Sequence, residues 1–97
     1  MLIVIVDFTV APKDSPLVHS TLLAEAPVVR ALPGNTDFSI WADPDHPGAW
    51  RLMHAWADAA GFDAYRATPA FKDVGAILFP LMQGKPSSRV FAADMLP

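Results

Sequence analysis

The stretch LIVIVDFTV, residues Leu2 to Val10, constrains the fold of this chain more than any other. β-Branched side chains are abundant in it, which favours a strand, and only Asp7 and Thr9 interrupt its apolar character. A strand that is apolar on both sides needs cover on both faces of its sheet. Helices of the same chain can cover one face, so the other face needs a second partner, most simply another copy of the chain.

The composition indicates the same assembly. The 97 residues suit one domain over residues 1–97, yet 53% of them are hydrophobic and only 18% are charged. A domain of this size buries only roughly 60–65% of the surface that its unfolded chain exposes. We therefore expect a homodimer that meets through the sheet face.

The net charge and the absence of cysteine exclude several classes of protein. The net charge is −3 and no run of Lys or Arg occurs, so the electrostatic footprint of nucleic-acid binding is missing. The absence of Cys excludes disulfides and thiolate metal sites and fits a reducing compartment. The apolar start MLIVIV lacks a basic leader and ends at Asp7, so it is too short to span a bilayer. We expect a cytoplasmic protein with neither nucleic acid nor membrane as a partner.

Helical spacing of apolar residues predicts a first helix after the strand. Ser15 is expected to cap this helix, because Pro16 then occupies the first helical position. Pro27 lies inside the helix and is expected to kink or split it. The helix is expected to end at the sequence LPG, where Gly34 tolerates the left-handed conformation.

A hairpin, a second helical region and a last strand follow. The hairpin strands are predicted at 37–42 and 50–56, joined by the turn DPDHPG. The helical region begins after Asp58, restarts at Pro69, and precedes a strand at 89–92. The order strand, helix, strand, strand, helix, strand is that of a ferredoxin-like α+β fold, with one antiparallel sheet and helices on one face.

Residues 33–72 resemble the antibiotic biosynthesis monooxygenase (ABM) family of dimeric α+β barrels, which includes quinol monooxygenases and anthrone oxygenases. The matching segments follow one another in the order of the family, without a gap: Pro33–Gly34, DFSIW, DPDHPGAW, MHAW and FDAYRATPAFK. The resemblance implies a homodimeric barrel that oxygenates a small aromatic quinol or anthrone without a cofactor.

The chain departs from the family at functional positions. The family's usual Glu, two residues before the Trp, is His54 here, and its common helix His is Tyr65. The haem-degrading branch uses a helix His at the position of Gly75, which cannot ligate iron. Haem degradation is therefore not implied, and no cofactor is expected.

His54 and Tyr65 are the polar candidates for chemistry. Cofactor-independent oxygenation needs a dry pocket, assistance in removing a phenolic proton, and stabilisation of the resulting anion beside dioxygen. His54 is the candidate for proton transfer, since the ordinary pKa of histidine is about 6.5. Tyr65 is the candidate hydrogen-bond donor to a substrate oxygen. The structural alternative is that His54 is a satisfied core or interface residue and that the Tyr65 ring only packs.

Five further residues are predicted to contact the substrate: Trp50, Trp56, Phe62, Phe71 and Asp7. The two Trp share a strand face with His54 and can stack on a flat ring, although Trp56 also suits a core contact. The two Phe can pack on the sheet and wall a cavity at once. Asp7 is either a base or, as we favour, a paired carboxylate at the dimer seam. The three His have no close spacing, so no metal site is predicted.

Two functions remain open on the sequence alone. The first is cofactor-independent monooxygenation of a small hydrophobic aromatic compound. The second is a non-catalytic dimeric protein of the same fold that binds a small molecule or serves as a stress or accessory protein.

Overall fold

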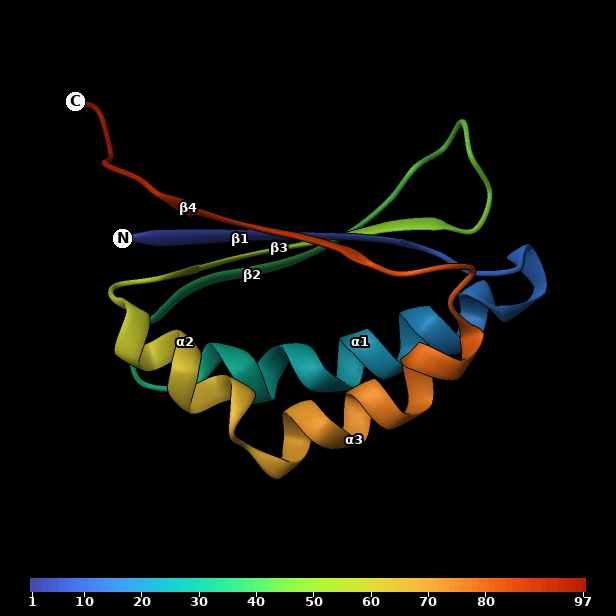
Figure 1. Cartoon of the computed structure of the whole chain (residues 1–97), viewed down its shortest axis with the longest axis horizontal. Coiled ribbons are helices and arrows are strands. Elements are labelled where there is room, and N and C mark those ends of the chain that lie inside the picture. Colours follow the sequence, from blue (N-terminus) through green and yellow to red (C-terminus); the bar gives the residue numbers. More distant parts are fainter.

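The apolar N-terminal stretch is an inner strand of a four-stranded antiparallel sheet in the computed structural model, which describes all 97 residues (Figure 1). Strand β1 (Leu2–Thr9) pairs with β3 (Ala49–Trp56) on one side and with β4 (Ser87–Ala92) on the other. Strand β2 (Asn35–Ala42) pairs with β3, which gives the order β2-β3-β1-β4.

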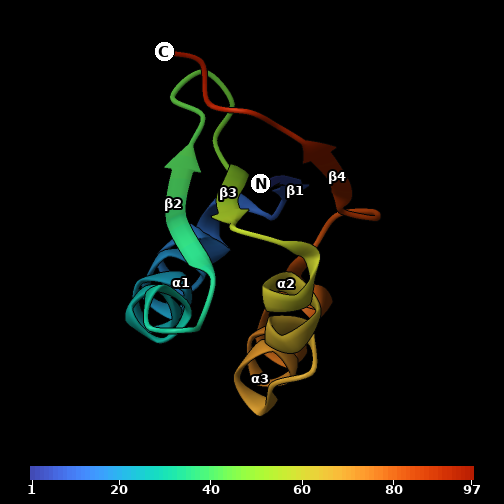
Figure 2. The same cartoon turned by 90° about the vertical axis from the view of Figure 1, so that its left-hand side faces the viewer.

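The structure has three α-helices. Figures 1 and 2 show that they cover one face of the sheet. They are α1 (Ser15–Arg30), α2 (Ala59–Arg66) and α3 (Pro69–Leu78), and the short 3₁₀ helices η1 (Pro12–Asp14) and η2 (Phe79–Leu81) precede α1 and follow α3. Figure 2 shows α1 on one side of the helix layer and α2 with α3 on the other. The predicted α+β ferredoxin-like fold is confirmed. No helix is both long enough and apolar enough to cross a membrane.

The first helix differs from the prediction at two positions. Ser15 is the first helical residue and not the cap, because η1 leads directly into α1. Its hydroxyl instead accepts a hydrogen bond from Trp50 Nε1 at 3.2 Å. Pro27 does not split α1. The amide that Pro27 lacks would have bonded the Leu23 carbonyl, and Leu23 is exposed, so water can satisfy that carbonyl.

Strand β3 begins one residue earlier than the sequence predicts, at Ala49, and two other strands begin two residues earlier. Strand β2 begins at Asn35 and not at Asp37, with a bulge between these two residues. The side-chain amide of Asn35 donates to the Asp37 carbonyl at 3.0 Å, which holds the bulge. Strand β4 begins at Ser87 and not at Arg89, directly after Pro86.

The helix-covered face of the sheet holds the hydrophobic core. One buried cluster gathers around Val4, Phe38 and Trp56, and a second gathers around Phe8 and Leu22. The alternation of β1 places Val4 and Phe8 on the same face, as a strand requires. The helices are therefore held to the sheet at both ends, and the candidate site lies between these clusters.

The other face of the sheet carries no helix (Figure 1). Trp41 and Phe91 lie on it and are 58% and 43% exposed. Asp7 also lies there, where its carboxylate accepts from Arg51 Nε at 2.6 Å and from Arg89 Nη2 at 3.3 Å. The hydrogen bond from Arg51 is the main cause that holds the pKa of Asp7 below its ordinary value. Asp7 is therefore a paired carboxylate, on the face opposite the helices.

Candidate active site

An apolar cavity of about 270 Å³ lies between the sheet and the α2–α3 side of the helix layer. Of its 19 lining residues 14 are hydrophobic, so it suits an apolar ligand. Val90 of β4 and Phe79 of η2 belong to the lining and are 50% and 57% exposed. The cavity therefore opens toward solvent between the edge strand β4 and the end of α3.

His54 is the buried polar group that the sheet presents to this cavity. It lies on β3, is only 4% exposed, and accepts a hydrogen bond at Nδ1 from Trp56 Nε1 at 2.7 Å. A neutral imidazole that accepts at Nδ1 carries its proton on Nε2. Nε2 has no protein partner and is not fully buried, so it remains available to a ligand as a donor.

Burial sets the charge state of His54. It lowers the pKa of His54 to about 4, against a smaller opposing effect of the Asp37 carboxylate. The surroundings explain the size of this effect, because the rings of Phe38, Phe62 and Tyr65 lie with their centroids 5.6 to 6.0 Å from the His54 ring. His54 is therefore neutral near pH 7, a good hydrogen-bond donor and a weak base.

Tyr65 is the buried polar group that the helices present to the cavity. Its ring stacks on Trp56 at 5.5 Å and meets Phe71 edge-on at 5.1 Å. Burial raises the pKa of Tyr65, and the carboxylate of Glu25 raises it further. The hydroxyl therefore stays protonated near neutral pH and can donate a hydrogen bond.

The start of α2 fixes this geometry. The Asp58 carboxylate caps the helix by accepting from the Gly61 amide at 3.1 Å, as the sequence predicts. A Cβ on Gly61 would lie 3.0 Å from the Pro33 carbonyl oxygen and 3.1 Å from the Trp56 ring. Glycine thus lets α2 approach the sheet closely enough for Tyr65 to stack on Trp56.

The structure brings four of the seven predicted site residues together around the cavity: His54, Tyr65, Phe62 and Phe71. Trp56 is fully buried and holds His54 from outside the cavity lining. Trp50 lies at the far end of the same strand face, where it stacks on His19 at 5.9 Å. Asp7 lies on the opposite face of the sheet, as described above.

One buried ionisable residue escaped the sequence prediction. Glu25 of α1 is 6% exposed and lies beside Tyr65. The signal was present, because Glu25 falls in the helical series of apolar positions that includes Leu22 and Val29. A charged residue within such a stripe indicates a buried charge, which calls for an explanation.

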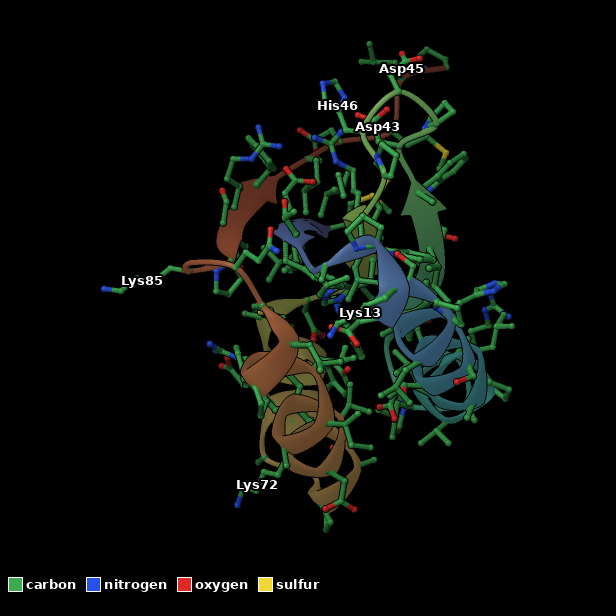
Figure 3. All side chains as sticks on the ribbon, turned by 90° about the vertical axis from the view of Figure 1, so that its right-hand side faces the viewer. Lys13, Asp43, Asp45, His46, Lys72 and Lys85 are labelled. Carbon is green, nitrogen blue, oxygen red and sulfur yellow. The ribbon has the colours of Figure 1, made fainter.

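No group of three or more His, Cys, Asp or Glu side chains converges on a point where a metal ion could bind. The exposed His46 pairs with Asp43 at 3.0 Å. Figure 3 shows these two residues and Asp45 at the tip of the β2–β3 turn, away from the helix layer, while Lys72 and Lys85 point outward from the protein.

Fold and site define a class: a ferredoxin-like α+β domain with an apolar cavity between its sheet and its helices. The antibiotic biosynthesis monooxygenase family matches the chain over residues 1–76. The chain belongs to this family.

Solved structures share the fold. A crystal structure of an antibiotic biosynthesis monooxygenase is 20% identical, with a TM-score of 0.89 over 98% of this chain and 100% of that chain. Rv0793 from Mycobacterium tuberculosis is 20% identical, with a TM-score of 0.89 over 98% and 96% of the two chains. SnoaB, a cofactor-independent oxygenase from Streptomyces nogalater, is 21% identical, with a TM-score of 0.81 over 98% and 94%. No curated protein matches the sequence significantly.

Proposed function

We propose that this protein is a cofactor-independent monooxygenase that acts on a small aromatic quinol or anthrone-like compound. The observation that carries the proposal is the apolar cavity whose polar groups include His54 from the sheet and Tyr65 from the helices. Its volume of about 270 Å³ lies just below the usual range of ligand pockets, which begins near ~300 Å³, so the ligand is small. Membership of the family and the likeness to SnoaB support the reaction class.

In this reaction the substrate itself is the reductant. One atom of dioxygen enters the substrate as a carbonyl oxygen, and the other leaves as water with two hydrogens from the substrate. The protein has to orient the ring, exclude water and stabilise the substrate anion that reacts with dioxygen. Phe62 and Phe71 provide the apolar walls.

His54 acts here as a donor more than as a base. Its pKa of about 4 lies far below that of a phenol, near ~10, so complete proton transfer to it is unfavourable. Its Nε2–H can instead bond the substrate oxygen and stabilise the anion as charge develops. This role replaces the proton transfer that the sequence predicts for His54.

A homodimer through the helix-free face is part of the same proposal. That face holds alternate residues of β1, among them Ile3 and Ile5, together with the exposed Trp41 and Phe91. Apolar side chains of this number on one face of a small domain are typical of an interface. The paired Asp7 would then lie at the seam between the two sheets.

Oxygen uptake with a panel of quinols and anthrones tests the reaction. We expect uptake by the wild-type protein and a fall in kcat of about 10²-fold in His54→Ala, the loss typical of one anion-stabilising donor. His46→Ala removes an exposed His from the turn and serves as the matched control. Uptake that is equal in His54→Ala and the wild type would show that His54 has no part in the chemistry.

The non-catalytic alternative has one observation in its favour. The two buried ionisable groups of the cavity lining are not strong bases near pH 7, because Tyr65 remains protonated and His54 is weakly basic. If the protein only binds its ligand, a quinone that enters the cavity would quench Trp56 fluorescence, and the protein would consume no oxygen with any reduced ligand. The two measurements together separate binding from catalysis.

A further inference from the structure

Glu25 is the only glutamate of the chain, and one of its carboxylate oxygens is buried without a hydrogen-bond partner. Its residue is 6% exposed, and Oε1 is fully buried without a hydrogen bond. None of the ion pairs in the structure includes it. A carboxylate in such a position is unfavourable for folding, and a neutral side chain would fit it at lower free energy.

Two ionisable groups from neighbouring helices act on Glu25. The hydroxyl of Tyr65 on α2 lies near the Glu25 carboxylate, and Asp73 of α3 adds a second negative charge nearby. No cation acts on it. Burial raises the pKa of Glu25, Asp73 raises it further, and Tyr65 lowers it in part. Glu25 is consequently a stronger base than a solvent-exposed glutamate.

Tyr65 lies between Glu25 and the cavity. Tyr65 belongs to the cavity lining, whereas Glu25 does not. A tyrosine hydroxyl accepts one hydrogen bond while it donates another, so it can pass a proton from a ligand to a second group. On the other wall, Nδ1 of His54 is occupied by the bond from Trp56.

We propose that Glu25 is the proton acceptor of the oxygenation, reached from the cavity through the hydroxyl of Tyr65. This inference rests on the proposed function. The substrate O–H bond breaks and its proton binds Tyr65 Oη, while the original proton of Tyr65 moves to a carboxylate oxygen of Glu25. The electron pair stays on the substrate oxygen, where Nε2–H of His54 meets it. The proton on Glu25 returns by the same route when reduced oxygen becomes water.

The composition makes this relay directly observable. The chain has one Glu and one Tyr, so protein labelled with ¹³C at Glu Cδ and Tyr Cζ gives one NMR signal from each. We expect the Tyr65 signal to shift with the same midpoint as the Glu25 signal in a pH titration. This shift should vanish in Glu25→Gln. Independent behaviour of the two signals would overturn the relay.

Kinetics provide the second readout. In the wild type we expect kcat/KM for oxygen uptake to decrease at acid pH, with the midpoint at which Glu25 is protonated. In Glu25→Gln we expect kcat/KM to be about 10²-fold lower and to show no such decrease at acid pH. Tyr65→Phe should lower kcat/KM by a similar factor, while the ¹³C NMR signal of Glu25 should still titrate. Asp73→Asn serves as the control: its maximal rate should match the wild type, and its acid limb should move to lower pH.

The outcomes separate the two proposals. A wild-type protein that consumes no oxygen with any compound contradicts the proposed function, and the relay falls with it. An active wild type whose rate and pH profile are unchanged in both Glu25→Gln and Tyr65→Phe overturns the relay alone.

Discussion

Trp56 donates a hydrogen bond from Nε1 to Nδ1 of His54 at 2.7 Å, and both side chains are buried between the sheet and the helices. The two residues are two positions apart on β3 and therefore share one face of the strand. The bond fixes the proton of the neutral His54 ring on Nε2, the nitrogen that is left for the cavity. The electrostatics of the site thus depend on an indole that does not itself line the cavity.

Trp56→Phe removes this donor while it keeps an aromatic ring. We expect a loss of about 1–3 kcal/mol in the free energy of unfolding, because His54 Nδ1 is left buried without a partner. We also expect ¹⁵N NMR to show a mixture of His54 tautomers in place of the single Nε2–H form. Trp50→Phe is the matched control, since it loses a similar bond to Ser15 away from the cavity. A pure Nε2–H tautomer in Trp56→Phe would contradict this account.

The depressed pKa of His54 predicts how stability changes with pH. Below about pH 6.5 the unfolded chain binds a proton at His54, whereas the folded protein does so only near pH 4. The contribution of His54 to the free energy of unfolding is therefore fully present above pH 6.5. It is lost as the pH falls toward 4, by at most about 3 kcal/mol. Urea unfolding of His54→Gln should lack this loss, and His46→Gln should keep it. A His54 midpoint near 6.5 in the folded protein would refute the prediction.

The raised pKa of Glu25 predicts that stability changes with pH in the opposite direction. The folded state raises its pKa, so folded protein binds the proton more tightly than unfolded protein, and this group destabilises the fold increasingly as pH rises above the ordinary value. Glu25→Gln should therefore be more stable than the wild type near pH 7, by on the order of 1 kcal/mol. Thermal unfolding at several pH values measures this. A variant that is less stable at pH 7 would mean that the carboxylate has a structural partner.

Much of the fold follows from local signals in the sequence. The apolar run of β1, the alternation of β3 and the cap at Asp58 each depend on residues close in the chain, and the structure contains all three. Pro27 misled because its effect depends on where the unpaired carbonyl of Leu23 lies, which is a tertiary property. In the same way Ser15 is engaged by Trp50, a residue distant in sequence.

The site was less accessible to prediction. The alternation of β3 places His54, Trp50 and Trp56 on one face, but the position of α2 and α3 along the strand decides which of them meets the cavity. The contribution of Val90 to its mouth arises from the pairing of β4 with β1, between opposite ends of the chain. Glu25 was visible in the pattern, whereas its contact with Tyr65 depends on helix packing.

The helix-free face predicts the oligomeric state. Ile5→Lys places a charge in the middle of this face and should convert a dimer into a monomer of 10.5 kDa in sedimentation at micromolar concentration. Val28→Lys changes an exposed position on α1 and should leave the dimer intact. A wild-type protein that sediments as a single 10.5 kDa chain would contradict the proposed interface.

The central claim is that the cavity between sheet and helices is where the substrate reacts. Val90 and Phe91 are neighbours on β4 that face opposite sides of the sheet, and only Val90 lines the cavity. Oxygen uptake by Val90→Trp and Phe91→Trp, with the anthrone or quinol that the wild type oxidises best, tests the claim most directly. We predict that Val90→Trp, which fills the mouth, loses at least about tenfold in kcat/KM while Phe91→Trp keeps the wild-type value. Equal activity in Val90→Trp and the wild type would contradict the claim.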